Sequence, residues 1–222
     1  RSTVELTSIE DDPGTGAKEN EFNVEGAYIT GSVYGGGKDA NVTGNTVVNI
    51  GTVTYTTADY EGVSIGGDIY GGGEGNGTNV TTKAAVNLGT DGVGNSSITG
   101  DIYGGSAFGT VNASDVKLYH GSVRNVFGGG KGQLADATVE PPLAAYSAVV
   151  TNAAEVSLLG ATVTAGIYGG CNVNGTVGTT TTVKLLGGSV VNVFGGGLGQ
   201  NTNVTNDVLG SLGDYGDDDN DD

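Results

Sequence analysis

Several residue types are scarce in this sequence of 222 residues. It contains no Met or Trp, three Pro, one Cys and one His, and Lys and Arg together number only eight. With a single thiol, Cys171, the chain cannot form an internal disulfide, and together with His120 it cannot assemble a zinc-ligand set. The basic residues form no stripe that could displace counterions from phosphates, so we expect no nucleic-acid partner.

Long apolar runs are also absent. No segment approaches the roughly 18 consecutive apolar residues that mark a membrane span, so we expect none. The chain starts at Arg1 rather than Met, and we expect no signal peptide in its first residues. We therefore expect a processed product or a piece of a longer precursor, and the single Cys171 to be a small filler inside the fold.

The negative charge is concentrated at the two ends. The formal net charge is −17, yet seven of the 25 acids lie in residues 1–25 and six in residues 214–222. The long middle section contains the remaining twelve acids and six bases, and is therefore much closer to neutral. We expect residues 1–25 to form an acidic N-terminal segment, a cap or donated strand, and residues 211–222 an Asp-rich tail.

Glycine is abundant, at 44 residues, and with so little Pro the composition is neither collagen-like nor typical of Pro-rich disorder. The glycines recur in one six-residue motif, which we call the box. Its six copies are Ser32-Val-Tyr-Gly-Gly-Gly, Asp68-Ile-Tyr-Gly-Gly-Gly, Asp101-Ile-Tyr-Gly-Gly-Ser, Asn125-Val-Phe-Gly-Gly-Gly, Gly166-Ile-Tyr-Gly-Gly-Cys and Asn192-Val-Phe-Gly-Gly-Gly. A repeat at this period indicates an array of stacked units.

Two further apolar segments follow each box. The first is a Val-x-Leu or Val-x-Ile pair, seen at Val48/Ile50, Val86/Leu88, Val116/Leu118, Val156/Leu158 and Val183/Leu185 and degenerating to Val208-Leu209. The second leads into the next box, at Val63/Ile65, Ile98, Val123, Val163 and Val190. Alternating β-branched residues between polar ones favour strands, so we expect three strands per unit.

The spacing of the box aromatics predicts the architecture. Successive aromatics are separated by 36, 33, 24, 41 and 26 residues, and the shortest intervals suit one three-strand coil, with the longer ones carrying loops. The largest insertion contains Pro141-Pro142, which cannot sit in a central ladder. We predict an all-β, right-handed parallel β-helix of about six to seven coils over residues 26–210.

Stacking of coils turns each box position into a ladder with a rise of about 4.8 Å. One predicted ladder is aliphatic and one aromatic, and the pattern leaves open whether the aromatic one faces outward or is redirected by the turn. Their members are Val33, Ile69, Ile102, Val126, Ile167 and Val193, and Tyr34, Tyr70, Tyr103, Phe127, Tyr168 and Phe194. The turn glycines are Gly35, Gly71, Gly104, Gly128, Gly169 and Gly195. We expect glycine there because φ is positive and because a side chain would clash with the next coil.

The boxes at Asn125-Val-Phe-Gly-Gly-Gly-Lys and Asn192-Val-Phe-Gly-Gly-Gly-Leu-Gly-Gln-Asn-Thr-Asn-Val-Thr resemble β-helical bacterial surface proteins, autotransporter-type adhesins among them. The resemblance spans residues 30–210, although those adhesins have shorter and more regular repeats. It implies a secreted or surface-attached shaft that presents loops or associates with copies of itself.

Enzymes also occur on this fold, so a catalytic alternative has to be weighed. Asp68 and Asp101 occupy the same box position in successive units, which would place their carboxylates roughly 5 Å apart. Such a pair fits either solvated turn residues or the acids of a carbohydrate-cleaving protein. Because the bases are scattered and His120 lies in a turn, we expect no enzyme.

The two ends favour self-association. Thr3-Val4-Glu5-Leu6 resembles the Val-x-Leu strand, and the chain closes after another version at Val208-Leu209, so both ends share one phase. An exposed strand edge invites another strand, and head-to-tail stacking would give an open filament. Acidic ends repel each other, which makes calcium on Asp214, Asp217, Asp218 and Asp219 a candidate for neutralising them.

We therefore expect a structural subunit of an extracellular filament or cell-surface appendage that associates head-to-tail with copies of itself. The alternatives are a carbohydrate-binding or carbohydrate-cleaving β-helix, with Asp68 and Asp101 as its acids, and a repeat fragment of a large surface adhesin. Apart from calcium, the sequence predicts no cofactor.

Overall fold

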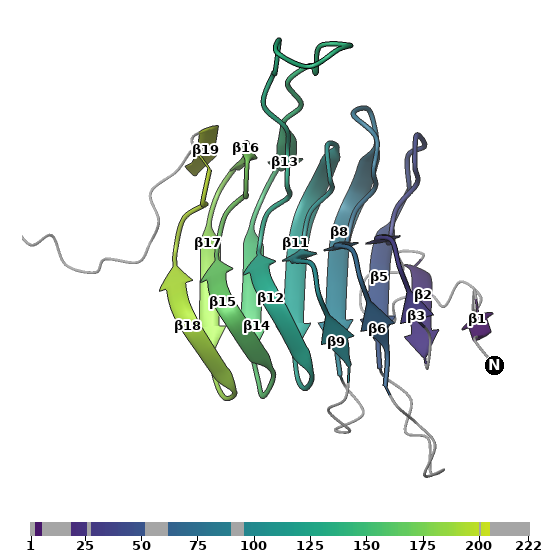
Figure 1. The fold of residues 1–222 in the computed structure, drawn as a ribbon, viewed down its shortest axis with the longest axis vertical. Helices are drawn as coiled ribbons and strands as arrows, with labels where there is room; N and C mark the ends of the chain where they lie inside the picture. The colour runs from purple at the N-terminus through teal and green to yellow at the C-terminus, as the bar shows by residue number, and fades with distance from the viewer. Residues whose placement is uncertain are drawn as a thin grey trace, which may run out of the picture.

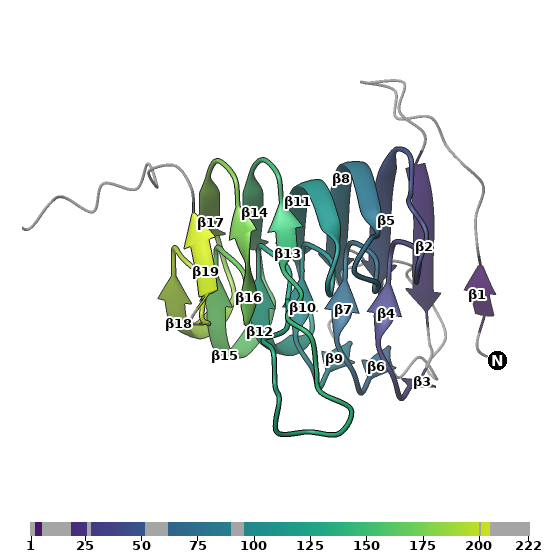
Figure 2. The ribbon, with the colours of Figure 1, turned by 90° about the horizontal axis from the view of Figure 1, so that it is seen from above.

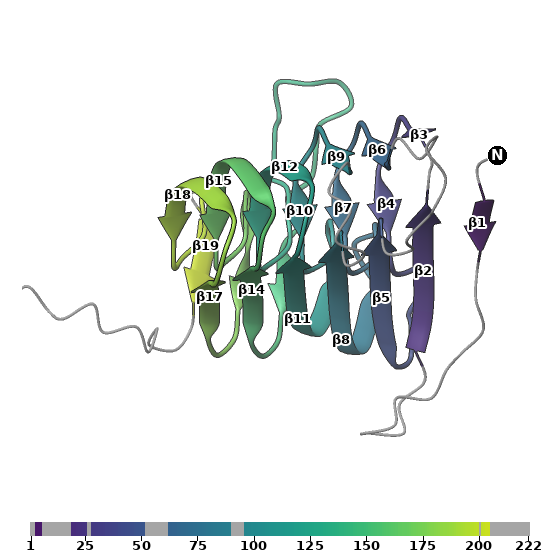
Figure 3. The same ribbon diagram turned by 90° about the horizontal axis from the view of Figure 1, so that it is seen from below.

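The protein is all-β in every part that its computed structural model describes, namely residues 3–5, 19–25, 28–51, 62–89, 96–199 and 201–204. These residues contain no helix, and hence none that could cross a membrane. Their strands form a ten-stranded and a nine-stranded sheet, which lie as two facing layers (Figures 2 and 3). Along both layers the strand order follows the chain, so β2 and β18 lie at opposite ends of the molecule (Figure 1).

The ten-stranded sheet collects the Val-x-Leu segments. Its strands are β1 (Thr3–Glu5), β2 (Glu19–Glu25), β5 (Asn45–Ile50), β8 (Asn79–Leu88), β11 (Thr110–Leu118), β13 (Ala148–Val150), β14 (Ala154–Leu158), β16 (Asn174–Val177), β17 (Thr181–Leu185) and β19 (Asn201–Val204). The order runs β1-β2-β5-β8-β11 and then divides into β13-β16-β19 and β14-β17. All these neighbours are parallel except β1 and β2.

The nine-stranded sheet collects the boxes and the segments that precede them. Its strands are β3 (Tyr28–Ile29), β4 (Val33–Tyr34), β6 (Ser64–Ile65), β7 (Ile69–Tyr70), β9 (Ser97–Ile98), β10 (Ile102–Tyr103), β12 (Ser122–Phe127), β15 (Thr162–Tyr168) and β18 (Ser189–Phe194). Because β12 pairs with both β9 and β10, two short strands of the early repeats become one continuous strand in the later ones. Every pairing in this sheet is parallel.

Equivalent residues of successive repeats face each other in register. Val33 pairs with Ile69, which pairs with Ile102, and the same column continues through Val126, Ile167 and Val193. In the other sheet the column of Val48, Val86, Val116, Val156 and Val183 runs parallel to it. Side chains from both sheets meet in one apolar cluster, most of whose members are under 5% exposed, so burial of these columns stabilises the fold.

A second apolar cluster lies beside the first and was not anticipated from the sequence. It consists of Val80, Ala84, Val111, Val150, Ala154, Cys171 and Val177, with Val42 packed against it. Cys171 is free and 1% exposed, and its thiol contacts the carbonyl oxygen of Ala148. The side chain therefore sits in an apolar column, and burial raises the pKa of its thiol to about 11.

The N-terminal segment differs from the expected arrangement. The strand in the Val-x-Leu position of the first repeat is β2, with Phe22 opposite Val48 and Val24 opposite Ile50. Val4 lies instead in β1, which runs antiparallel to β2 on its outer edge. The prediction that Val4 continues the parallel phase of the repeats is therefore wrong, and the parallel pairing begins inside the segment assigned to residues 1–25.

The Pro-containing insertion between β12 and β13 extends away from both sheets (Figure 1). Two antiparallel bridges, Gln133 with Tyr146 and Asp136 with Leu143, hold its sides together. Pro142 follows Pro141, whose peptide bond with Glu140 is cis. We refer to residues 131–147 as the arm.

The box glycines serve close packing rather than a left-handed turn. The described glycines with positive φ are Gly44, Gly51, Gly62, Gly89, Gly121, Gly132 and Gly188, and no box glycine is among them. A Cβ at Gly128 would instead overlap the carbonyl oxygen of Gly169 in the next repeat. Of the two reasons expected for these glycines, the positive φ is wrong and the clash between repeats is the physical cause.

Candidate functional site

The box aromatics form one continuous stack of six rings. Neighbouring ring centroids from Tyr34 through Tyr70, Tyr103, Phe127 and Tyr168 to Phe194 are 4.8–5.0 Å apart, and the ring planes differ by only 4–9°. The separation equals the spacing of hydrogen-bonded strands, because in-register parallel pairing places each ring directly over its counterpart. We call this stack the aromatic column.

The aromatic column lies on the face of the box strands opposite to the aliphatic column. Neighbouring residues of a strand point to opposite faces, so Ile102 enters the main core while Tyr103 does not. Tyr103 and Phe127 are 0% exposed, and the column packs with Ala107 and Phe108 in a cluster of its own. Its inner members are thus a buried stack, which answers the question that the sequence left open.

A polar column runs beside the aromatic one at the first box position. The side chains of Ser32, Asp68, Asp101 and Asn125 each accept a hydrogen bond from the backbone N–H of the equivalent residue in the next repeat. Between β12 and β15 the ladder shifts register close to this position, which leaves the Gly166 N–H for the Asn125 side chain to satisfy. Ser, Asp and Asn all provide a suitable oxygen, which accounts for the residue types found here.

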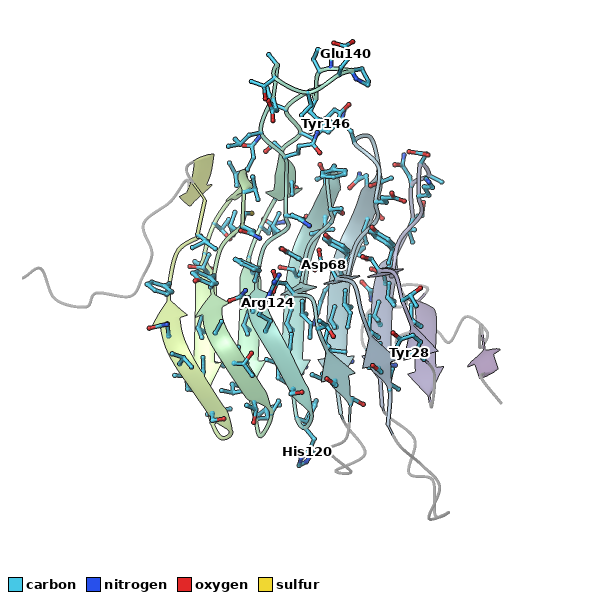
Figure 4. The ribbon with its side chains drawn as sticks, in the orientation of Figure 1. Tyr28, Asp68, His120, Arg124, Glu140 and Tyr146 are labelled. Carbon is cyan, nitrogen blue, oxygen red and sulfur yellow. The ribbon has the colours of Figure 1, made fainter. Side chains whose placement is uncertain are left out.

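Two cations neutralise the carboxylates of this column. The guanidinium of Arg124 donates to both oxygens of Asp101, at 2.8 and 3.0 Å, and the ammonium of Lys131 lies 2.9 Å from Oδ2 of Asp68. Asp101 and Asp68 are 6% and 16% exposed in their side chains. Figure 4 shows Asp68 and Arg124 close together on the box side of the molecule.

The tyrosine hydroxyls complete this network. Tyr70 donates to Asp68 at 2.9 Å, Tyr103 donates to Asp101 at 3.4 Å, and the side-chain amide of Asn172 donates to the Tyr103 hydroxyl at 2.7 Å. Burial, followed by the nearby carboxylate of Asp68, raises the pKa of Tyr70. Burial also raises the pKa of Tyr103, against the opposing hydrogen bond from Asn172.

The hydrogen bonds made by Asp68 and Asp101 determine how these two carboxylates behave. Burial opposes ionisation of Asp68, but hydrogen bonds from the Lys131 ammonium, the Asp101 backbone and the Tyr70 hydroxyl outweigh it and lower the pKa of Asp68. Asp101 accepts from Arg124, from the backbone and side chain of Asn125 and from Tyr103. Each of the two carboxylates thus also binds the backbone N–H of the next repeat.

The other residues considered from the sequence lie apart from this network. His120 occupies a turn at the edge of the sheets far from Asp68 and Arg124 (Figure 4). In the described ranges no group of three or more His, Cys, Asp or Glu side chains could hold a metal ion. The calcium candidates Asp214, Asp217, Asp218 and Asp219, and the assembly residues Leu6, Val208 and Leu209, lie outside the described residues.

The last described repeat leaves its columns uncovered. Val193 is 40% and Phe194 47% exposed, whereas their counterparts Val126 and Phe127 in an inner repeat are 0% exposed. Leu185, at the end of the described part of the Val-x-Leu column, is 52% exposed. Among the described residues, nothing lies within 4 Å of a Cβ built at Gly195 or Gly196. We call this surface of β17, β18 and the final box the open end.

A shallow hollow of about 230 Å³ lies on the ten-stranded sheet, lined by Asn45, Thr46, Val47, Lys83, Ala85, Asn87, Asp115 and Lys117. Lys83 and Lys117 lie 2.8 and 3.3 Å from Oδ2 of Asp115. The other oxygen of Asp115 is buried and has no hydrogen-bond partner among the described residues. Parallel register brings these residues together from β5, β8 and β11, in a cluster that no motif of the sequence predicted.

Comparison of the chain with protein-family models, with curated proteins and with solved structures finds no match.

Proposed function

We propose that the chain is a right-handed parallel β-helix that serves as a structural subunit of a filament or surface appendage and associates head-to-tail with copies of itself. Two facing parallel sheets, to which each repeat contributes in turn, support the β-helix. A right-handed sense follows from the strong preference of parallel crossover connections for that hand. Its resemblance to β-helical surface proteins supports an extracellular or cell-surface location.

The observation that carries the proposal is the contrast between inner and terminal repeats. The columns are covered in the inner repeats and end at Val193 and Phe194, which are 40% and 47% exposed. A contiguous apolar surface of this kind, bordered by a strand whose outer edge pairs with no described residue, marks an interaction site. The surface repeats along the chain, so the partner that fits it best is another run of the same repeat.

The network around Asp68 and Asp101 supports a structural protein over a carbohydrate-cleaving enzyme. A glycosidase needs one carboxyl group free to give a proton and another free to attack or to activate water. Here each carboxylate holds a cation and the N–H of the next repeat. The proposal assigns this pair to cohesion between repeats.

Calcium on the Asp-rich tail belongs to the same proposal. The ends of the chain carry thirteen of its 25 acids, and two acidic ends repel one another when they meet. A divalent cation on Asp214 and Asp217–Asp219 would reduce that repulsion. Calcium should then promote assembly more than sodium at equal ionic strength, and identical assembly with the two salts would contradict this part of the proposal.

Sedimentation velocity of the full chain over a series of concentrations tests the proposed function. We expect a growing population of large species whose fraction rises with protein concentration, as mass action requires of an open polymer. A single monomeric species at every concentration, with and without calcium, would contradict the proposal.

The hollow at Asp115 favours carbohydrate binding as a second candidate. Its buried carboxylate oxygen could accept a hydrogen bond from a sugar hydroxyl once the side chain turns, and Asn45 and Asn87 add amide groups nearby. Titration calorimetry with neutral and acidic polysaccharides tests this function. Binding by the wild type that is lost in Asp115→Ala but kept in Glu155→Ala supports it, and the absence of binding to both polysaccharide classes contradicts it.

A further inference from the structure

Neighbouring repeats are joined at the boxes by one contact that recurs along the fold. The N–H after each aromatic residue donates to the carbonyl oxygen of the aromatic residue in the next repeat, at 2.8–2.9 Å. The donor and acceptor pairs are Gly35 to Tyr70, Gly71 to Tyr103, Gly104 to Phe127, Gly128 to Tyr168 and Gly169 to Phe194. Donors thus always point toward the C-terminal end of the stack, and carbonyls toward the N-terminal end.

This polarity leaves complementary groups at the two ends. At the open end, the N–H groups of Gly195 and Gly196 have no acceptor in the described residues. At the other end, the carbonyls of Tyr34 and Gly36 occupy the positions of Tyr70 and Gly72, and they receive no N–H from any residue whose position is described. Unpaired donors at one end therefore match unpaired acceptors at the other.

Steric fit points to the same partner. In the first five boxes, a Cβ at the first glycine would overlap the carbonyl of the equivalent glycine one repeat further on. The same test at Gly195 finds open space among the described residues. The space above Gly195 thus corresponds to the space that the following repeat fills at the other box glycines.

The side chains of the ends also continue the columns. Phe194 presents a half-exposed ring, and Tyr34 begins the same aromatic column at the other end. Asn192 is exposed and occupies the position of Asn125, whose Oδ1 accepts from the N–H of Gly166. A following repeat would offer its Ser32 N–H to Asn192 in the same way.

We propose that the open end of one copy docks directly on the β4 end of a second copy, so that Phe194 stacks on Tyr34, Val193 pairs with Val33 and the Gly195 N–H donates to the Tyr34 carbonyl. The inference rests on the proposed self-association and specifies its interface and register. The contact reproduces the one between repeats within the chain, and it is heterologous, so it propagates as a filament.

In the ten-stranded sheet, β1 covers the edge on which a second copy would dock. Among the described strands, β17 is the one that a docking copy would bring against the outer edge of β2, yet that edge is paired antiparallel with β1, with Val4 opposite Val24. β1 therefore acts as a cap on its own chain, as edge strands of monomeric proteins are often covered. It must leave before the ten-stranded sheet can continue, so β1 delays assembly rather than supplying a donated strand.

Gly195→Val in the full chain tests the interface. A valine there meets open space in the monomer but would overlap the docking copy, so we expect an unchanged thermal midpoint and assembly slowed about tenfold or more. Gly77→Val is the matched control, because Gly77 is exposed and equally open but lies in the turn after the second box, outside both terminal boxes, and it should assemble as the wild type does.

The outcomes separate the two proposals. A wild type that never assembles contradicts the proposed function and the interface with it. A wild type that assembles alongside an equally competent Gly195→Val variant overturns the interface alone. Val4→Pro, which removes a backbone donor from β1, should shorten the lag before assembly. A longer lag in Val4→Pro would overturn the role of β1 as a cap.

Discussion

Gly128 and Gly169, 41 residues apart in the sequence, lie so close together that a single Cβ on Gly128 would overlap the carbonyl oxygen of Gly169. The methyl group of Ala154 would lie only 3.3 Å from the same Cβ. The Gly169 carbonyl and the Ala154 methyl group could make room only by displacing the repeat to which they belong. This closeness ties the glycine-rich composition to the stacking of repeats.

Gly128→Val should therefore lower the free energy of unfolding by about 2 kcal/mol or more, the range observed when side chains are forced into packed interiors. Urea denaturation followed by circular dichroism measures the change. Gly195→Val is the comparison, since the same substitution at the equivalent box position meets no described neighbour. Equal stabilities for the two variants would contradict close packing as the reason for the box glycines.

Removing Asp101 should lower the free energy of unfolding more than removing its ion-pair partner Arg124. Asp101 is buried and satisfies four donor groups, so Asp101→Ala should cost about 3 kcal/mol. The Arg124 side chain is 57% exposed, and Arg124→Ala should cost less than about 1 kcal/mol. Comparable losses in denaturant titrations of the two variants would show that the cation, rather than the backbone and amide donors, provides the stabilisation.

Alkaline pH should destabilise the fold through the buried tyrosines. The pKa values of Tyr70 and Tyr103 are raised by burial, so their stabilising contribution is complete below the unfolded value of about 10 and is lost as pH rises above it. Absorbance of tyrosinate and circular dichroism should therefore change together for these two groups. Tyr70→Phe should weaken the pH dependence above pH 10, and an unchanged dependence would contradict this assignment.

Acidic pH should destabilise the fold through protonation of Asp68. Because the pKa of Asp68 is lowered in the folded state, its contribution is present above the unfolded value of about 3.9 and is lost as pH falls through the lower folded value. Lys131→Met removes the hydrogen-bonded ammonium and should flatten the stability profile in this range. Thermal midpoints measured from pH 2 to 6 check the effect, and parallel profiles for the variant and the wild type would contradict it.

The repeat columns could be predicted because each depends on one residue type at one box position. In parallel in-register stacking, Ile69 pairs with Ile102 and Tyr70 with Tyr103. These pairs can be found by aligning the box motifs in the sequence. The pairing of Lys131 with Asp68 could not be found in this way. These residues are 63 positions apart, and their contact depends on how the chain leaves the fourth box to enter the arm.

Two other features escaped prediction for physical reasons. The column of Val80, Val111, Val150 and Val177 follows the boxes at irregular intervals, because loops such as the arm separate it from them. The reversal of β1 has no counterpart in the repeat, since Val4-x-Leu6 has the same alternation in either direction. An alternating pattern predicts a strand and its buried face but not whether that strand pairs parallel or antiparallel.

Electron microscopy of the assembled full chain tests the central claim most directly. If copies stack end to end with Phe194 on Tyr34, each copy adds six layers, so filaments should show an axial subunit repeat of about 29 Å, six times the strand spacing of about 4.8 Å. Filaments without such an axial repeat, or particles that remain single at every concentration, would contradict the account.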